Sequence, residues 1–120
     1  MKKKEKKQDE RRSIPRIKIS YYVPVIESEK LETLGILSDI STKGLLVNSQ
    51  KNLPVDQQVK LRLDLSDDGF EHPFINFNAQ VINVRPDPYG PGYYNIGFEI
   101  LDLSIANFRI IEKIMEKYAA

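Results

Sequence analysis

Residues 58–65 read Gln-Val-Lys-Leu-Arg-Leu-Asp-Leu, and they give the clearest indication of the fold class. Apolar and polar residues alternate along this stretch, which is typical of a β-strand with one buried face and one solvated face. Strands that are wet on one side belong to antiparallel sheets, because parallel sheets are covered on both faces. We therefore expect a mainly β architecture.

The same period of two recurs on both sides of this stretch. Strands are expected before it at 17–25, 34–40 and 45–49, and after it at 74–84 and 94–100. Within 74–84 the inward positions run to Val81 and then switch to Ile82 and Val84, as a β-bulge would produce. Bulges let a sheet curl toward a barrel. The residues 86–92, rich in proline and glycine, predict a hairpin loop.

The pattern changes after Leu103, where apolar residues recur at intervals of three and four. They are Ile105, Phe108, Ile111, Met115 and Tyr118. This spacing predicts one amphipathic helix packed on the core, with Ser104 as its N-cap. Six short strands and one terminal helix together predict a small antiparallel barrel that carries a helix.

Length and composition limit the class of protein. A chain of 120 residues suits one domain, and the absence of cysteine excludes a disulfide scaffold, a thiolate zinc site and thiol catalysis. The lysine-rich start is not followed by an apolar run of about 7–15 residues, and no stretch approaches about 18 apolar residues. We therefore expect a soluble cytoplasmic protein without a membrane span.

The net charge of +1 hides an uneven distribution. Residues 1–16 hold eight Lys and Arg and three Asp and Glu, a surplus of +5, which leaves −4 on the remaining residues. We expect residues 1–10 to be a flexible basic arm and residues 11–120 to be the barrel domain, because the arm lacks the apolar periodicity that would order it.

Catalytic chemistry finds no support in the sequence. His72 is the only histidine, and Pro73 beside it predicts a solvated loop position. Clusters with metal-ligand spacing, a nucleophile with a nearby base, and glycine-rich phosphate motifs are all missing. The sequence therefore predicts a protein that is not an enzyme and that has no metal and no cofactor.

An arginine segment precedes the first strand. It contains Arg11, Arg12 and Arg16, and Pro15 disfavours a continuous helix, so Arg12 and Arg16 lie in an extended or turned segment. Guanidinium groups are planar forks that suit phosphate oxygens and the O6/N7 edge of guanine.

A second polar segment, residues 39–44, connects the second and third strands. The alternation places Asp39 and Ser41 on one side, opposite Ile40. A carboxylate at Asp39 could accept hydrogen bonds from the N1–H and N2–H of guanine, and the Ser41 hydroxyl could bond a phosphate or the backbone. Gly44 permits a positive φ or a close approach of a ligand. The alternative is an ordinary serine turn closed by glycine.

Together and in this order, Arg12-x-x-x-Arg16 and Asp39-x-Ser41-x-x-Gly44 resemble the signature of the PilZ domain, the bacterial receptor module for cyclic di-GMP. The resemblance extends to the pair Gly97-Phe98 and the closing helix. It implies a six-stranded antiparallel split β-barrel with a C-terminal α-helix and a flexible basic N-terminal arm.

The resemblance also implies a ligand and a set of contacts. Arg12 and Arg16 would clasp the phosphates and the guanine edges, Asp39, Ser41 and Gly44 would seat a guanine, and Arg11 would extend the arginine run. We expect a non-catalytic sensor whose arginine segment becomes ordered on the barrel when cyclic di-GMP binds. Its response would pass to another protein or to self-association as a homodimer.

Two other functions remain open at this point. One is a PilZ-like adaptor that binds only proteins, which the five intact motif residues disfavour. The other is a single-stranded nucleic-acid binder built on a small barrel. That function needs basic residues along the barrel, whereas residues 17–120 carry a net −4.

Overall fold

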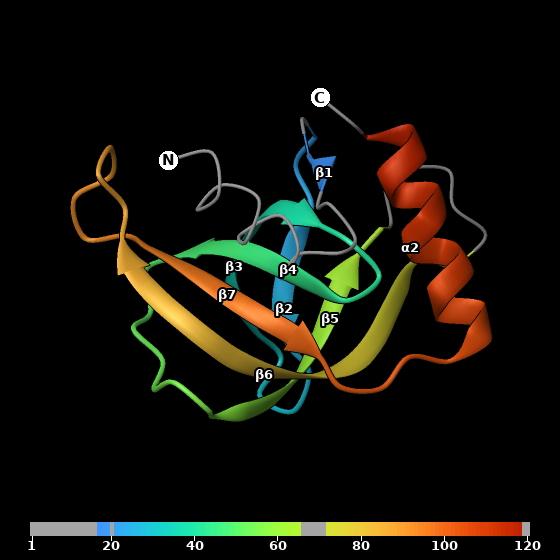
Figure 1. Cartoon of the computed structure of the whole chain (residues 1–120), viewed down its shortest axis with the longest axis horizontal. Helices are drawn as coiled ribbons and strands as arrows, with labels where there is room; N and C mark the ends of the chain where they lie inside the picture. Colours follow the sequence, from blue (N-terminus) through green and yellow to red (C-terminus); the bar gives the residue numbers. More distant parts are fainter. Residues whose placement is uncertain (1–16, 20, 66–71, 119–120) are drawn as a thin grey trace, which may run out of the picture.

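The computed structural model describes residues 17–19, 21–65 and 72–118 (Figure 1). The expected basic arm and the arginine segment lie outside these residues. The strands are β1 (Ile17–Lys18), β2 (Pro24–Glu27), β3 (Glu32–Ile40), β4 (Gly44–Ser49), β5 (Gln58–Asp64), β6 (Phe74–Pro86) and β7 (Tyr94–Ile100), and helix α2 (Ile105–Lys117) follows them. In the described ranges, no helix has the length and apolar character needed to cross a membrane.

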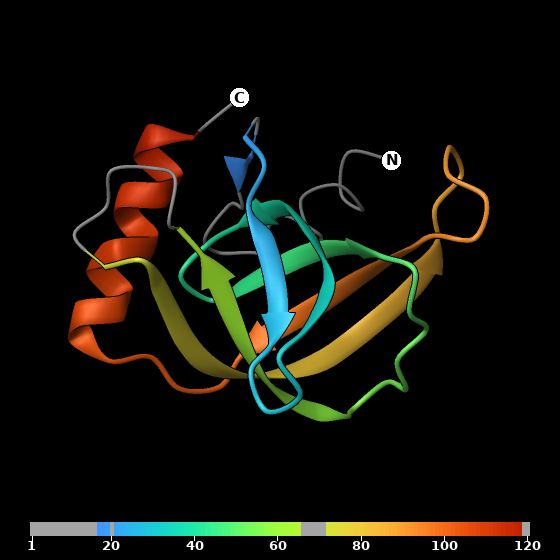
Figure 2. The ribbon, with the colours of Figure 1, turned by 180° about the vertical axis from the view of Figure 1, so that it is seen from behind.

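Six of the strands close a barrel. The sheet order is β3-β2-β5-β6-β7-β4, each neighbouring pair is antiparallel, and an additional pairing of β3 with β4 joins the two ends. Strand β1 is a short addition that pairs with β3 alone. Figures 1 and 2 show the ring from its two sides, with α2 beside it. The predicted six-stranded antiparallel barrel with a C-terminal helix is confirmed.

The period-two pattern correctly locates the core strands. On β5, the side chains of Leu61 and Leu63 are fully buried, whereas Lys60 on the opposite face is exposed. The bulge in β6 is also confirmed, because the register with β7 shifts between Val81 and Asn83.

The side chains around the bulge differ from the expectation. Ile82 was expected to point inward, but it is 53% exposed. It is the extra residue of the bulge, with Val81 opposite Phe98 and Asn83 opposite Gly97 on the partner strand. The inward phase resumes only at Val84, which packs against the core.

The expected strand at 17–25 is wrong in its continuity. The structure divides it into β1, which pairs with the far end of β3, and β2, where Val25 lies between Gly35 of β3 and Leu63 of β5. Tyr21, which the alternation placed inside, is exposed in the connection, and its ring packs on Tyr118 with centroids 4.7 Å apart. Both β1 and β2 pair with β3, and the alternation is lost in the connection that interrupts their pairing.

Helix α2 has the predicted cap and a shifted apolar stripe. The Asn107 N–H donates to Ser104 Oγ at 3.0 Å, as expected of an N-cap. However, Ile105 is 76% exposed and Phe108 is also exposed, so these two predicted core positions are wrong. The buried stripe begins at Ile111, because the first turn lies against a polar strand edge, where Asn107 Nδ2 donates to the Asn76 carbonyl.

The β6–β7 connection is the hairpin loop that the sequence predicts. The Asp87 N–H donates to the Tyr93 carbonyl at 2.9 Å, and Gly92 has a φ of 83°, a conformation that favours glycine. Tyr94 beyond the loop packs against the core.

A buried carboxylate ties three segments of the fold together. Glu27 at the end of β2 is 8% exposed, and its carboxylate lies 3.2 Å from Lys51 Nζ and 3.7 Å from Lys30 Nζ. Lys51 also contacts Glu32 at 3.4 Å. The hydrogen bond to Glu27, supported by the charges of Glu27 and Glu32, raises the pKa of Lys51 above its usual 10.5, although desolvation opposes the rise. Lys51 therefore stabilises the fold while it is protonated.

We predict that the stability from Lys51 is fully present below pH 10.5 and is lost as the pH rises through the higher pKa of the folded state. Urea unfolding of the wild type and of Lys51→Met should show a difference in unfolding free energy that shrinks above that pH. Lys113→Met, at an exposed helix position, is the matched control. A difference that stays constant with pH would contradict the prediction.

Candidate ligand-binding corner

The connection between β3 and β4, residues 41–43, forms a tight corner. The Ser41 hydroxyl accepts hydrogen bonds from the backbone N–H of Lys43 at 3.1 Å and of Gly44 at 3.3 Å. The Ser41 N–H donates to the Gly44 carbonyl at 2.8 Å. Of the two partners considered for this hydroxyl, the backbone is the one that the structure shows.

Ser41 does not share the exposure of Asp39. Ser41 is 1% exposed, and Ile40 before it is fully buried, whereas Asp39 is half-buried. The alternation does not extend to Ser41, because β3 ends at Ile40 and Ser41 belongs to the turn, where its hydroxyl accepts two backbone hydrogen bonds. The corner therefore presents one carboxylate at its rim and holds its hydroxyl inside the turn.

Gly44 is required by the neighbouring strand. A Cβ at this position would lie 2.5 Å from the carbonyl oxygen of Phe98 on β7, which is closer than carbon and oxygen can approach. Among the described glycines only Gly92 has a positive φ, so Gly44 does not serve that purpose. The close approach that the structure shows at Gly44 is that of the β7 backbone, and the approach of a ligand there stays a prediction.

The corner is also hydrogen-bonded to β7. The Ile100 N–H donates to the Lys43 carbonyl at 2.8 Å, and Gly44 pairs with Glu99. These contacts fix the turn against a strand whose neighbouring residues are in the core. The site is therefore built on rigid elements, as binding sites that need a defined geometry require.

The arginine residues Arg11, Arg12 and Arg16 lie outside the described residues. The structure does describe the three residues that follow Arg16. Ile17 pairs with Ile40, and Lys18 pairs with Asp39, in the short antiparallel ladder of β1 with β3. The Ile19 N–H adds a hydrogen bond to the Ser38 carbonyl at 2.9 Å. The chain that leaves the arginine motif is therefore joined to the rim of the corner.

Two lysines at the corner were not singled out from the sequence. Lys18 is the strand partner of Asp39, and Lys43 lies in the turn, both with exposed side chains. Lys18, as the strand partner, adds positive charge beside Asp39, and Lys43 adds positive charge in the turn. From the alternation, Lys18 is expected only on the solvated face of a strand. Nothing in residues 17–19 themselves indicates which strand they pair with.

The described part of the chain holds no cluster of three metal-ligating side chains. His72 is exposed at a bend, which confirms its predicted loop position.

The family model of the PilZ domain matches residues 10–117, so the chain belongs to the PilZ family. PilZ domains are receptor modules for cyclic di-GMP and are generally not catalytic. The arginine motif and the Asp39–Gly44 motif both lie within the matched range. The resemblance found in the sequence is thereby confirmed at the level of the family.

Solved structures agree with the fold. The inhibitor of motility MotI/DgrA of Bacillus subtilis superposes with a TM-score of 0.69 and 16% identity, over 87% of this chain and 49% of that one. MrkH of K. pneumonia in its apo state gives 0.68 and 20%, over 87% of this chain and 47% of that one. The chain thus spans about half the length of each. No curated protein matches the sequence.

We predict that Gly44→Ala destabilises the barrel by roughly 1–3 kcal/mol, because the new methyl group meets the Phe98 carbonyl and the two strands must move apart. Urea unfolding measures the change. Lys43→Ala at the neighbouring exposed position should cost less than about 0.5 kcal/mol. Equal stability of Gly44→Ala and the wild type would show that β4 and β7 are farther apart than described.

Proposed function

We propose that the chain is a non-catalytic cyclic di-GMP sensor that binds its ligand between the arginine segment and the β3–β4 corner. In this proposal Arg12 and Arg16, extended by Arg11, bind the phosphates and the outer edges of the guanines. Asp39 accepts hydrogen bonds from the N1–H and N2–H of one guanine. The signal is the ordering of the arginine segment on the barrel.

The observation that carries the proposal is the pairing of β1 with β3. The two motifs are separated by more than twenty residues in sequence, yet Ile17 pairs with Ile40 and Lys18 with Asp39. Arg16 is joined to Ile17 by one peptide bond, and Ile17 pairs with Ile40 of β3. To reach this end of β3, the guanidinium of Arg16 needs to span only the distance between neighbouring strands, roughly 5 Å, and the length of one residue along the chain. The chain connectivity supports a single site made from both motifs.

Charge at the corner supports a dianionic ligand. The side chains of Lys18 and Lys43 are exposed at the corner, and Lys18 follows the three arginines of the segment closely in the sequence. The half-buried Asp39 carboxylate would be unfavourable beside a bare phosphate, but it matches the donor edge of guanine. This combination favours a guanine nucleotide over an anion without a base.

Ser41 and Gly44 act as positioning residues in this proposal. The Ser41 hydroxyl accepts hydrogen bonds from the backbone N–H groups of Lys43 and Gly44. Because Gly44 has no side chain, the turn can lie close to β7. Both residues shape the corner that presents Asp39. The proposal also keeps residues 1–10 as a separate arm and the cytoplasm as the place of action.

Isothermal titration calorimetry with cyclic di-GMP tests the proposal. We expect micromolar binding by the wild type, because two or three charged contacts supply about that affinity. Arg12→Ala, Arg16→Ala and Asp39→Ala should each bind at least about tenfold more weakly. Arg109→Ala, which removes an exposed helix arginine, is the matched control and should bind as the wild type does.

Cyclic di-AMP serves as the control ligand, because adenine lacks the N1–H and N2–H donors that the Asp39 carboxylate would accept. The proposal fails if the wild type gives no heat with cyclic di-GMP, or if Arg12→Ala binds as tightly as Arg109→Ala does. Equal binding of both cyclic dinucleotides would remove the assigned role of Asp39.

A further inference from the structure

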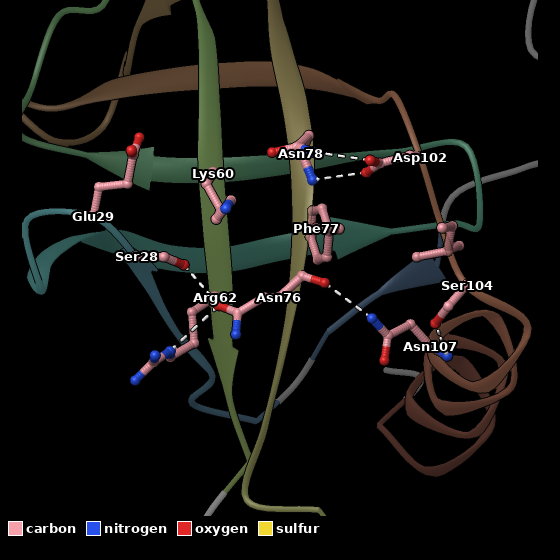
Figure 3. A pocket seen from close by; sticks show the side chains of 11 residues that line it. Ser28, Glu29, Lys60, Arg62, Asn76, Phe77, Asn78, Asp102, Ser104 and Asn107 are labelled. Carbon is pink, nitrogen blue, oxygen red and sulfur yellow. Dashed lines mark hydrogen bonds between the residues drawn. The ribbon is translucent and has the colours of Figure 1, made fainter.

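A polar groove of about 720 Å³ lies on the outer face of β5 and β6, beside the start of α2 (Figure 3). Lys60 and Arg62 of β5 and Asn76 and Asn78 of β6 line it together with Asp102 and Asn107. None of its lining residues belongs to the β3–β4 corner. The groove is therefore a second candidate surface.

Two cations occupy the middle of this groove. Lys60 and Arg62 are two residues apart on the wet face of one strand, so they point the same way about 7 Å apart along it. The Arg62 guanidinium lies over the Phe74 ring at 4.0 Å from its centroid, and its Nε points at Asn76 Oδ1 at 3.4 Å. These contacts hold the guanidinium in one orientation.

The donor groups of both cations remain available within the described part of the chain. The terminal nitrogens of Arg62 have no hydrogen-bond acceptor among the described residues, and Lys60 makes no ion pair with any of them. Arg62, held in one orientation, and the exposed Lys60 beside it thus offer cationic donors that are suited to binding carboxylates.

Carboxylates lie on both sides of Lys60 in the groove. Asp102 accepts hydrogen bonds from the Asn78 N–H at 3.0 Å and from Asn78 Nδ2 at 2.8 Å, which lower the pKa of Asp102 below 3.8. Glu29, after β2, is exposed on the other side. Since the strand order is β2-β5-β6-β7, Lys60 lies between them, as Figure 3 shows. The groove thus carries positive charge at its centre and negative charge at its edges.

The polar lining is already ordered by hydrogen bonds. Asn76 Oδ1 accepts from Ser28 Oγ at 2.7 Å, and Asn107 Nδ2 donates to the Asn76 carbonyl at 2.9 Å. Binding here would therefore immobilise few further side chains, and preorganised surfaces lose less entropy on association.

We propose that this groove docks an extended segment of a protein partner that has acidic residues at its centre and basic residues on either side. The central carboxylates would bind Arg62 and Lys60, and the basic side chains would face Glu29 and Asp102. A free phosphate fits this charge pattern poorly, because the flanking carboxylates repel it. The docking surface stands whether or not the corner binds cyclic di-GMP.

The groove and the corner are connected through the end of β7. The backbone carbonyl of Lys43 in the corner accepts a hydrogen bond from the Ile100 N–H. The N–H of the next residue, Leu101, donates to the Asn78 carbonyl at 2.9 Å. Asn78 in turn holds Asp102 at the edge of the groove. A partner in the groove would therefore contact Asn78, which is hydrogen-bonded to the strand segment that fixes the corner.

An NMR titration tests the docking surface with a blocked peptide of sequence Lys-Gly-Glu-Glu-Gly-Lys. We expect shifts of the side-chain amide signals of Asn76, Asn78 and Asn107, and at least about tenfold weaker binding by Arg62→Gln and by Lys60→Gln. Lys60 is exposed, so its variant tests the charge without disturbing packing. Lys113→Gln on the helix is the matched control and should bind as the wild type does.

Two further probes separate the alternatives. The analogue of the peptide with glutamine in place of glutamate should leave the groove signals unchanged, and inorganic phosphate at the same concentration should not displace the peptide. Unshifted groove signals with the acidic peptide, equal binding of the glutamine analogue, or displacement by phosphate would each overturn the proposal.

Discussion

Closure of the barrel through β4 is the constraint on which the rest of the structure depends. This strand pairs with β3 on one side and β7 on the other, and both contacts need residues without side chains. A Cβ at Gly35 would lie 2.1 Å from the Asn48 carbonyl oxygen, and one at Gly44 would lie 2.5 Å from that of Phe98. Because β4 is held so closely, the turn that enters it has little freedom. The same closeness that completes the core therefore shapes the corner.

The corner and the groove use different parts of the same barrel. The corner lies at the end of β3, where a register shift brings Asp39 to the rim and β1 attaches the chain that follows the arginine motif. The groove uses the wet face of β5 and β6, where the alternation turns Lys60 and Arg62 outward. A small barrel can carry both surfaces because each strand offers only its outer face, and the inner faces form one core.

Periodicity was informative where a strand is straight and packs on one side, as at Leu61 and Leu63. It failed at Ile82, Tyr21 and Ile105, which are all exposed apolar residues. Each of these lies where the chain bends, bulges or leaves the core, and the phase of an alternation changes at such points. A local pattern contains no information on where the partner strand ends. The bulge in β6 was predicted, but the direction of its extra side chain was not.

The amino-acid sequence alone determined the fold class, the order of the six barrel strands along the chain, the capped helix and the two motifs that mark the PilZ family. These properties are local or belong to the family, so they can be inferred from the hydrophobic periodicity, the helix cap residue and the spacing of the motif residues. Only the tertiary structure decided that Ser41 is buried in its own turn, that Gly44 serves β7, and that Lys18 is the strand partner of Asp39. Those facts depend on the register between strands that are distant in sequence, and register is set by the packing of the whole barrel.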